Sequence, residues 1–353
     1  MKVFIRVPNW VGDSVMAVPA LRELRRIFTE AHVTLVARPW VAGLFDGEAL
    51  ADDLIPVKDA HGFTESIKHF IDLTRRLRRE KFDYAVLLQN AFGAALTARA
   101  AGARNIVGYP TDGRRALLHT RIPFESDYKN RHQVFYYLNI AAKLEERLAG
   151  ESQVDLKDAS PRLSASEESK EKMRQLLALS GIEKTFPQDR ILAINPGATN
   201  SRAKQWLAER FAETADLLAE RDGFQTVIIG TASDLEVARE VARRMRTRSA
   251  MLAGRTSIAD LKAVLACSSL VLSNDTGAAH VSAALGVPTV VVFGPTEHFA
   301  TRPFSPVAEI VRHNVECSPC MLRECPIDHR CMTRVEVDQV YHAARILMAQ
   351  AAE

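Results

Sequence analysis

Polar and small residues gather where apolar runs end, which is where an α/β chain exposes reactive groups. The apolar run at residues 3–7 is followed by residues 8–14, which contain Gly12 and Asp13. Gly12 allows a close backbone approach or a positive φ. Asp13 lies at the start of a stretch with helical periodicity. Its carboxylate therefore either stabilises the first helical turn or serves as a general base. The two roles are compatible, and Asp13 is the candidate catalytic residue.

A second segment, residues 195–201, follows another apolar run and continues to Arg202, Lys204 and Trp206. Its small residues and its hydroxyls, including that of Thr199, suit contact with a phosphate. Lys204 could neutralise a pyrophosphate. The alternative interpretation is an ordinary turn with a solvated lysine.

The third segment, residues 273–280, has the most specific pattern. Gly277 and the small residues after it begin a helix whose free N–H groups can hold an anion. Asp275 could accept hydrogen bonds from sugar hydroxyls. His280 lies one turn further into the helix, where a core or capping histidine is the alternative to a ligand contact.

A fourth segment, residues 230–236, also follows an apolar run. A carboxylate there could bind ribose hydroxyls, as acidic residues do in dinucleotide-binding folds. Helix capping by Ser233 or Asp234 is the alternative. The G-x-G-x-x-G, P-loop and H-E-x-x-H motifs are missing, which weakens the dehydrogenase, NTPase and zinc-protease interpretations.

The composition is that of a globular protein with about two domains. Of the 353 residues, 47% are hydrophobic and 25% are charged, with no apolar run long enough to span a bilayer. A net charge of +3 is low for a dedicated nucleic-acid binder, so no nucleic-acid partner is expected. Basic residues cluster at 75–81 and between 114 and 131. They are either solvated surface or a contact for an anionic substrate or membrane face.

The sequence has five cysteines, and Cys317, Cys320, Cys325 and Cys331 lie in one segment. The first ten residues predict a strand and not a secretion signal. We therefore expect a reducing compartment, where disulfides are not the default. Four thiols could bind a structural zinc ion, with His329 able to replace one ligand. The spacing is irregular for a zinc ribbon, so free thiols or oxidation-prone pairs are the preferred interpretation.

The elements that position these segments alternate between β-rich runs and amphipathic helices. Strands are predicted at residues 3–7, 33–37 and 84–88, and helices at 15–28, 64–79 and 131–148. Turn residues at 158–161 and 185–187 bracket a helix at 165–180, and the pattern then restarts. Strands follow at 191–195, 226–229, 270–273 and 289–293, and helices at 208–220, 235–245, 258–266 and 335–351. Ser257 and Asp260 resemble a capping box.

This order predicts two doubly wound α/β domains, each with a parallel sheet whose ligands lie beyond the carboxyl ends of the strands. We assign residues 1–160 to the first domain and 161–333 to the second. The C-terminal helix, residues 334–353, is expected to pack back on the first domain.

Taken together, the segments resemble the lipopolysaccharide heptosyltransferases of glycosyltransferase family nine over nearly the whole chain. The matching pieces are residues 8–13 with 19–21, 195–198 with 204–206, 273–277 with His280, and 293–296. The type II enzymes, which add the second core heptose, are the most similar group. The cysteine segment is similar to that of many type II-like members and differs from members that lack these cysteines.

The resemblance implies a GT-B fold, in which two Rossmann-like domains face each other across a cleft. It implies an inverting transfer of L-glycero-D-manno-heptose from ADP-heptose to heptosyl-Kdo2-lipid A during lipopolysaccharide inner-core biosynthesis. No cofactor is required, and a divalent metal is expected to be dispensable. The expected location is cytoplasmic and peripheral to the inner membrane, because the anionic lipid A-core acceptor lies at the membrane's inner face.

The resemblance also implies roles for individual residues. Asp13 is the implied base. Within the donor site, Lys204 and the backbone at Thr276 and Gly277 hold the diphosphate, Asp275 holds the heptose and Glu236 holds the ribose, with Asp234 as its competitor. The donor-binding set is Thr199, Lys204, Glu236, Asp275, Thr276, Gly277 and His280. We further hypothesise that Arg114 and Arg115 contact the acceptor's phosphates and Kdo carboxylates.

Several alternatives stay open at this point. A related transferase could use another donor or add the first heptose, and a GT-B epimerase would convert the donor alone. A non-catalytic nucleotide-sugar-binding module would have no need of Asp13. The intact loop at residues 10–13 favours an enzyme.

Overall fold

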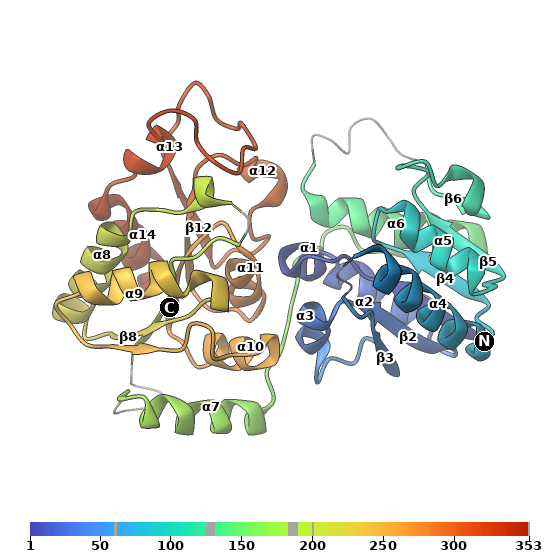
Figure 1. The fold of residues 1–353 in the computed structure, drawn as a ribbon, viewed down its shortest axis with the longest axis horizontal. Helices are drawn as coiled ribbons and strands as arrows, with labels where there is room; N and C mark the ends of the chain where they lie inside the picture. Colours follow the sequence, from blue (N-terminus) through green and yellow to red (C-terminus); the bar gives the residue numbers. More distant parts are fainter. Residues whose placement is uncertain (60–61, 124–130, 183–189, 200, 352–353) are drawn as a thin grey trace. The chain divides into compact units, whose positions relative to one another are not determined.

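The computed structural model describes residues 1–59, 62–123, 131–182, 190–199 and 201–351 (Figure 1). Contacts divide the chain into two compact units, Met1–Pro161 and Arg162–Glu353. Each unit is built around its own parallel sheet. The turn expected at residues 185–187 and the basic residue Lys129 lie outside the described residues.

The first unit has a six-stranded sheet in the order β3-β2-β1-β4-β5-β6. Its strands are β1 (Lys2–Arg6), β2 (His32–Ala37), β3 (Asp53–Pro56), β4 (Tyr84–Leu87), β5 (Asn105–Gly108) and β6 (Thr120–Arg121). The central strand β1 pairs in parallel with β2 and β4. Because helices cover both faces, β1 is a continuous apolar run in which Val3, Phe4 and Ile5 are buried.

Two pairs of helices pack on this sheet, α2 with α6 and α4 with α5. The helices of the unit are α1 (Val11–Met16), α2 (Val18–Ile27), α3 (Pro39–Ala42), α4 (Phe63–Glu80), α5 (Phe92–Ala100) and α6 (Gln133–Ala149). The single helix expected at residues 15–28 is wrong, because a break at Ala17 separates α1 from α2. Pro19 explains the break, since proline has no N–H to continue a helix but fits its first turn.

The second unit repeats the design, with the order β12-β11-β10-β7-β8-β9. Its strands are β7 (Ile191–Asn195), β8 (Gln225–Ile228), β9 (Ser249–Met251), β10 (Leu270–Asn274), β11 (Thr289–Phe293) and β12 (Ala308–Arg312). Its helices are α7 (Glu167–Leu179), α8 (Ala208–Asp222), α9 (Leu235–Arg244), α10 (Ile258–Ala266), α11 (Gly277–Ala284), α12 (His298–Thr301), α13 (Arg330–Thr333) and α14 (Val337–Gln350). The capping box at the start of α10 is confirmed, because Ser257 and Asp260 each accept a hydrogen bond from the other's backbone N–H.

The C-terminal helix α14 packs against α8, β11 and β12 within the second unit. Val340 and Leu347 on its inner face are buried in the apolar core of that unit. The expected contact of this helix with the first domain stays a prediction.

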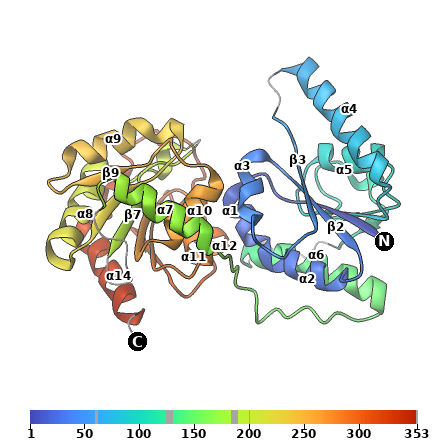
Figure 2. The same ribbon diagram turned by 90° about the horizontal axis from the view of Figure 1, so that it is seen from below.

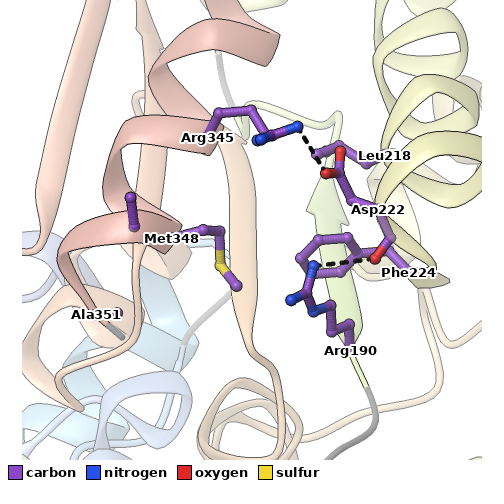
Figure 3. Close-up of a pocket in the computed structure, with 8 residues that line it drawn as sticks. Arg190, Leu218, Asp222, Phe224, Arg345, Met348 and Ala351 are labelled. Atoms are coloured by element: carbon purple, nitrogen blue, oxygen red, sulfur yellow. Dashed lines mark hydrogen bonds and ion pairs between the residues drawn. The ribbon is translucent and has the colours of Figure 1, made fainter. Parts of the chain in front are cut away.

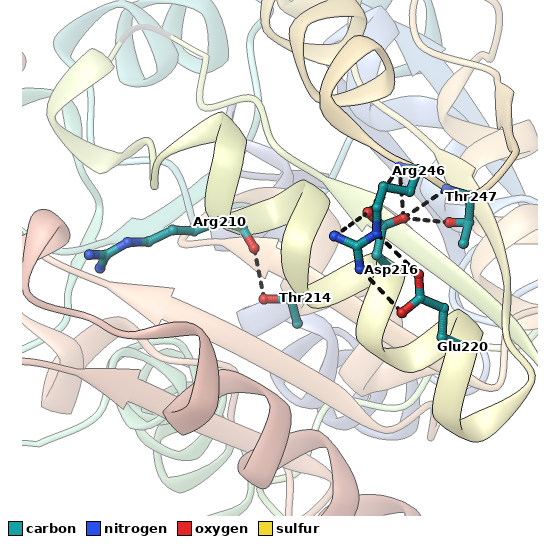
Figure 4. A network of polar contacts seen from close by, with 6 residues as sticks. All are labelled: Arg210, Thr214, Asp216, Glu220, Arg246 and Thr247. Atoms are coloured by element: carbon teal, nitrogen blue, oxygen red, sulfur yellow. Dashed lines mark hydrogen bonds and ion pairs between the residues drawn. The ribbon is translucent and has the colours of Figure 1, made fainter.

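A buried carboxylate joins α8 to the chain that leads into β9 (Figure 4). Asp216 is 1% exposed and accepts hydrogen bonds from the backbone N–H groups of Arg246 and Thr247 and from the Thr247 hydroxyl. The Arg246 guanidinium then pairs with Glu220, one turn further along α8. These bonds satisfy a carboxylate that would be costly to bury alone.

The outer strands β3, β5, β6, β9 and β12 were not predicted. β6 has only two residues, and the exposed residues Asp53 and Pro56 in β3 and Glu309 in β12 interrupt the apolar pattern. Among the described residues no helix has the length and apolar character needed to cross a membrane.

Candidate active site

Both sheets have a topological switch point at their centre, between β1 and β4 in the first unit and between β7 and β10 in the second. At such a point neighbouring loops diverge to opposite faces, and ligands of doubly wound sheets bind there, beyond the carboxyl ends of the strands. Residues 8–14 follow β1, residues 196–206 follow β7 and residues 275–280 follow β10. The fold therefore places the main predicted segments at the two switch points.

Two buried asparagines clamp the loops of the second switch point together. Asn195, at the end of β7, donates from Nδ2 to Thr276 Oγ1 at 2.8 Å and to Ser273 Oγ at 3.3 Å. Asn274, at the end of β10, donates from Nδ2 to Pro196 O at 2.8 Å. Each strand end thus holds the loop that follows its neighbour.

Asn274 also fixes the approach to Lys204. It is fully buried, and its Oδ1 accepts from the backbone N–H of Trp206 at 2.9 Å. The Trp206 ring is buried, and its Nε1 donates to Val335 O. The short segment around Lys204 is therefore anchored, through Trp206, to the end of β10, where the third segment lies.

Lys204 and Asp275 form an ion pair at this site. Lys204 Nζ lies 2.7 Å from Asp275 Oδ2, and the side chains are 28% and 7% exposed. Thr296, which follows β11, donates to the same carboxylate oxygen at 2.7 Å. The lysine is thus held at the switch point and retains access to solvent on one side.

Helix α11 begins at Gly277, with Thr276 as its N-cap residue. The Thr276 side chain makes no capping bond there, so the first N–H groups of the helix have no such acceptor. The Lys204 ammonium and the free N–H groups at the start of α11 are donors suited to an anion that draws Lys204 away from Asp275. Thr199 is exposed on the neighbouring loop, whereas His280 is buried one turn into α11.

The two acidic candidates for a ribose contact, Asp234 and Glu236, differ in their local contacts. Asp234 is buried, and its Oδ2 accepts from the Thr231 N–H and hydroxyl in a capping box. Its carboxyl group also lies against Gly197, where an added Cβ would come within 2.2 Å of Asp234 Cγ. Glu236 is exposed and lines an open pocket of about 800 Å³ that extends along α9 as far as Arg243. Asp234 is therefore a structural group, and Glu236 remains available.

Asp13 lies in the first turn of α1 and is half-buried. Its carboxylate is close enough to the buried Tyr137 hydroxyl to contribute, after burial, to the raised pKa of that phenol. The loop before it is held by the Ser14 hydroxyl, which donates to Pro8 O at 3.0 Å, and by Arg6, which donates to Asn9 Oδ1 at 2.7 Å. A carboxylate is thus presented from a fixed loop at the first switch point.

Arg114 does not lie on the surface, contrary to our expectation. It is fully buried, and its guanidinium donates to Tyr109 O, Gln89 O and Asn90 Oδ1. Burial lowers the pKa of this group. Arg114 therefore ties the segment after β5 to the segment after β4, and only Arg115 of the expected pair is exposed.

The cysteine segment contains no preformed metal site. Within the described residues no group of three or more histidine, cysteine, aspartate or glutamate side chains could hold a metal ion. All five cysteines are free thiols, with Cys317 and Cys320 exposed and Cys331 buried. Burial raises the pKa of Cys331 to about 11, with a further contribution from the neighbouring thiols.

A second cavity, of about 350 Å³, lies at the edge of the second sheet opposite to the carboxyl ends of its strands (Figure 3). Arg190 and Phe224 in its wall directly precede β7 and β8, so the cavity lies at the amino ends of these strands. Asp222 accepts from Arg345 at 3.0 Å and, through its backbone carbonyl, from Arg190 at 3.2 Å. This position excludes the cavity as the nucleotide site expected at the carboxyl ends.

Asn195, Asn274 and Thr296 have no predicted role. Their side chains make the contacts that bring the second and third segments together. A signal was available, because an asparagine at the end of an apolar strand must find partners when it is buried.

The family model of glycosyltransferase family 9 (heptosyltransferase) matches residues 70–330. Lipopolysaccharide heptosyltransferase 2 of Escherichia coli K12 is 28% identical over 318 residues, which cover 88% of each chain. Lipooligosaccharide heptosyltransferase 2 of a Campylobacter jejuni O:2 strain is 28% identical over 357 residues, covering 99% of this chain and 98% of the relative. The solved structure of E. coli ADP-heptose lps heptosyltransferase II has a TM-score of 0.83 and 25% identity, covering 100% of both chains. The expected GT-B fold is confirmed.

Proposed function

Because the chain belongs to glycosyltransferase family 9 (heptosyltransferase), we propose that it transfers L-glycero-D-manno-heptose from ADP-heptose to heptosyl-Kdo2-lipid A in lipopolysaccharide inner-core biosynthesis. The observation that carries the proposal is the clamp formed by Asn195 and Asn274, which holds Lys204 near the start of α11. A lysine and a helix N-terminus at a switch point suit the diphosphate of a nucleotide sugar. The named relatives are heptosyltransferases of the second kind, which supports this donor and acceptor.

The proposed reaction is a single displacement with inversion. The oxygen of an acceptor heptose hydroxyl forms a bond to the anomeric carbon while the bond from that carbon to the ADP oxygen breaks on the opposite face. Asp13 accepts the hydroxyl proton, which becomes acidic as the new bond forms. Lys204 and the N–H groups at Gly277 stabilise the negative charge that develops on ADP. On this proposal no divalent metal is required.

The remaining donor contacts follow from the positions of the side chains. Glu236 binds the ribose hydroxyls, and Asp275 binds hydroxyls of the heptose once Lys204 turns towards the diphosphate. Thr199 contributes a hydroxyl to the phosphates, and His280 supports the start of α11 from within the unit. These assignments are supported by the exposure of Glu236 and Thr199 and by the burial of His280.

On the acceptor side, Arg115 is the proposed contact for phosphates or Kdo carboxylates, because it is exposed. Arg114 is not proposed as a contact, since its guanidinium is occupied by three protein acceptors. The lipid part of the acceptor places the reaction at the cytoplasmic face of the inner membrane, and no nucleic-acid partner is proposed.

The experiment incubates the protein with ADP-heptose and with core acceptors that carry no heptose or one heptose, and weighs the products. We expect one heptose to be added only to the acceptor that already carries one. Addition to the heptose-free acceptor would assign the first transfer instead. Conversion of the donor without acceptor would indicate an epimerase, and ADP-heptose binding without turnover would indicate a non-catalytic module.

Variants test the two halves of the mechanism separately. Asp13→Asn should lower turnover by ~10²–10⁴-fold, the usual effect of losing a general base, and leave the Kd for ADP within about twofold. Lys204→Gln should weaken ADP binding. Glu30→Gln, which removes an exposed carboxylate elsewhere in the first unit, is the control. Full turnover by Asp13→Asn with purified acceptor would refute the assignment of the base.

A further inference from the structure

Helix α4 is the least buried long helix of the first unit. Of its 18 residues only Leu77 is fully buried. Leu73 and Leu77 pack against the sheet, and the helix also contacts α5. Figure 2 shows the first turns of α4 projecting beyond the rest of the unit. Most of the other side chains of this helix are exposed within the described part of the unit.

The solvent-facing side of α4 is apolar in its first half. Phe63 is 82% exposed, Ile67 is 43% exposed and Ile71 is 38% exposed. Spacings of four residues place these three side chains on one side of a helix, next to one another. A stripe of large exposed apolar side chains is unfavourable in water and marks a surface that another phase or molecule covers.

The same side becomes basic in the second half of the helix. Arg75 and Arg78 continue the series at spacings of four and three residues, and Lys68 lies one turn before Ile71. Both arginines are exposed, and within the described residues neither forms an ion pair. By contrast, the acidic Glu80 at the end of α4 is paired with Lys2 at 2.8 Å. We call Phe63, Ile67, Ile71, Arg75 and Arg78 the α4 surface.

We propose that the α4 surface binds the face of a bilayer that contains anionic lipid. An exposed helix with an apolar stripe and flanking cations has the pattern of a helix that lies in the membrane interface. The apolar side chains enter the boundary between head groups and acyl chains, and the arginines meet lipid phosphates. Charge complementarity favours this occupant over a second copy of the chain. Two α4 surfaces in parallel would bring their arginines together, and two antiparallel surfaces would bury arginines against apolar side chains.

The position of the helix suits a lipid-linked acceptor, and in this respect the inference rests on the proposed function. Helices α4 and α5 both follow carboxyl ends of parallel strands, the edge of the first sheet that also carries Asp13. At the start of α5, Phe92 is 49% exposed and Leu96 is 37% exposed. Bilayer binding through this part of the unit would hold that edge near the membrane, where the acceptor lies.

The test measures binding to vesicles that contain neither donor nor acceptor, so it does not depend on catalysis. The full-length protein is floated with vesicles of phosphatidylethanolamine with phosphatidylglycerol, and with vesicles of phosphatidylcholine alone. We expect binding to the first kind, little binding to the second, and a loss of binding as salt rises because exposed charges are screened. The variants are Phe63→Ser/Ile67→Ser and Arg75→Gln/Arg78→Gln.

The apolar variant should bind the anionic vesicles about tenfold more weakly or worse, since two large side chains no longer leave water. The charge variant should bind about 30-fold more weakly, for two cations near an anionic surface. Leu179→Ser is the matched apolar control, because Leu179 is 88% exposed on the second unit. Arg104→Gln/Lys172→Gln is the charge control, with side chains 77% and 74% exposed. Both controls should bind as the parent does.

Three outcomes would overturn the proposal. They are the absence of binding to anionic vesicles, equal binding by the α4 variants and the parent, and equal losses in the controls. A change of the α4 variants from dimer to monomer in sedimentation, without vesicle binding, would assign the surface to a second copy instead. Thermal melting and turnover on a delipidated acceptor should match the parent for every variant. A parent that binds vesicles but transfers no sugar would refute the proposed function and leave the α4 surface standing.

Discussion

Gly197 gives the sharpest test of how the second switch point is built. A Cβ placed on this residue would lie 2.2 Å from Asp234 Cγ, 2.3 Å from Oδ1 and 2.6 Å from Cβ. Relief to an ordinary carbon–carbon contact needs a movement of about 1.3 Å. Asp234 cannot turn away cheaply, because its Oδ2 holds the N–H and hydroxyl of Thr231. Gly197→Ala must therefore displace the loop after β7 or break that capping box.

The expected free-energy change depends on which of the two occurs. Overpacking costs about 1–3 kcal/mol, and loss of the cap would add about 1 kcal/mol, so Gly197→Ala should lower the free energy of unfolding by about 1–4 kcal/mol. The displaced loop carries Lys204, and loss of its charged hydrogen bond to the diphosphate costs about 1.5–3 kcal/mol. ADP should then bind about 10- to 100-fold more weakly.

Urea unfolding and ADP titration measure the two effects. Gly93→Ala is the control, because a Cβ there would meet nothing within 4 Å and the residue lies inside α5. This control should be neutral or slightly stabilising. Asp234→Gly removes all three clashing atoms, so adding Gly197→Ala in that background should cost little. If Gly197→Ala matches Gly93→Ala in both stability and ADP affinity, the close approach of Gly197 to Asp234 does not shape the loop.

Two further predictions follow, one for each unit. In the first unit Glu145 receives the Arg26 guanidinium at 2.6 Å, and this hydrogen bond lowers the pKa of the carboxyl below its ordinary value of 4.5. Because the pKa of Glu145 is lower in the folded state, its carboxylate contributes stability above pH 4.5, and this contribution is lost as the pH falls through the folded pKa. Glu145→Gln should therefore lower the free energy of unfolding by about 2 kcal/mol in urea at pH 7, and the difference from the parent should narrow as the pH falls below 4.5. A difference that does not depend on pH would contradict this. In the second unit burial raises the pKa of Cys331 to about 11. Iodoacetamide at pH 8 should therefore alkylate Cys331 about a hundred times more slowly than the exposed Cys317, as measured by peptide mass spectrometry. Equal rates would show that the Cys331 thiol is not protected.

The sequence by itself determined the layers and the position of the reactive loops. Central strands such as β7 and β11 were predicted with their observed bounds. Their residues are apolar except for Asn195 and Thr289 at their ends, because both faces are covered, and such runs are visible without tertiary information. The segments around Asp13, Lys204 and Asp275 could be found because small and polar residues directly follow those runs.

Only the tertiary structure decided which of these polar groups remain available for a ligand. Arg114 and Arg115 are neighbours of the same type, yet one is buried on three protein acceptors and the other is exposed. Asp234 and Glu236 look interchangeable in the sequence, but only Asp234 is occupied by a capping box. A hydrogen-bond partner such as Pro196 for Asn274, 78 positions away, is set by which strands become neighbours in the sheet. Local residue patterns fix where a chain bends and what it buries, whereas pairing between distant loops depends on strand order and register, which no short segment encodes.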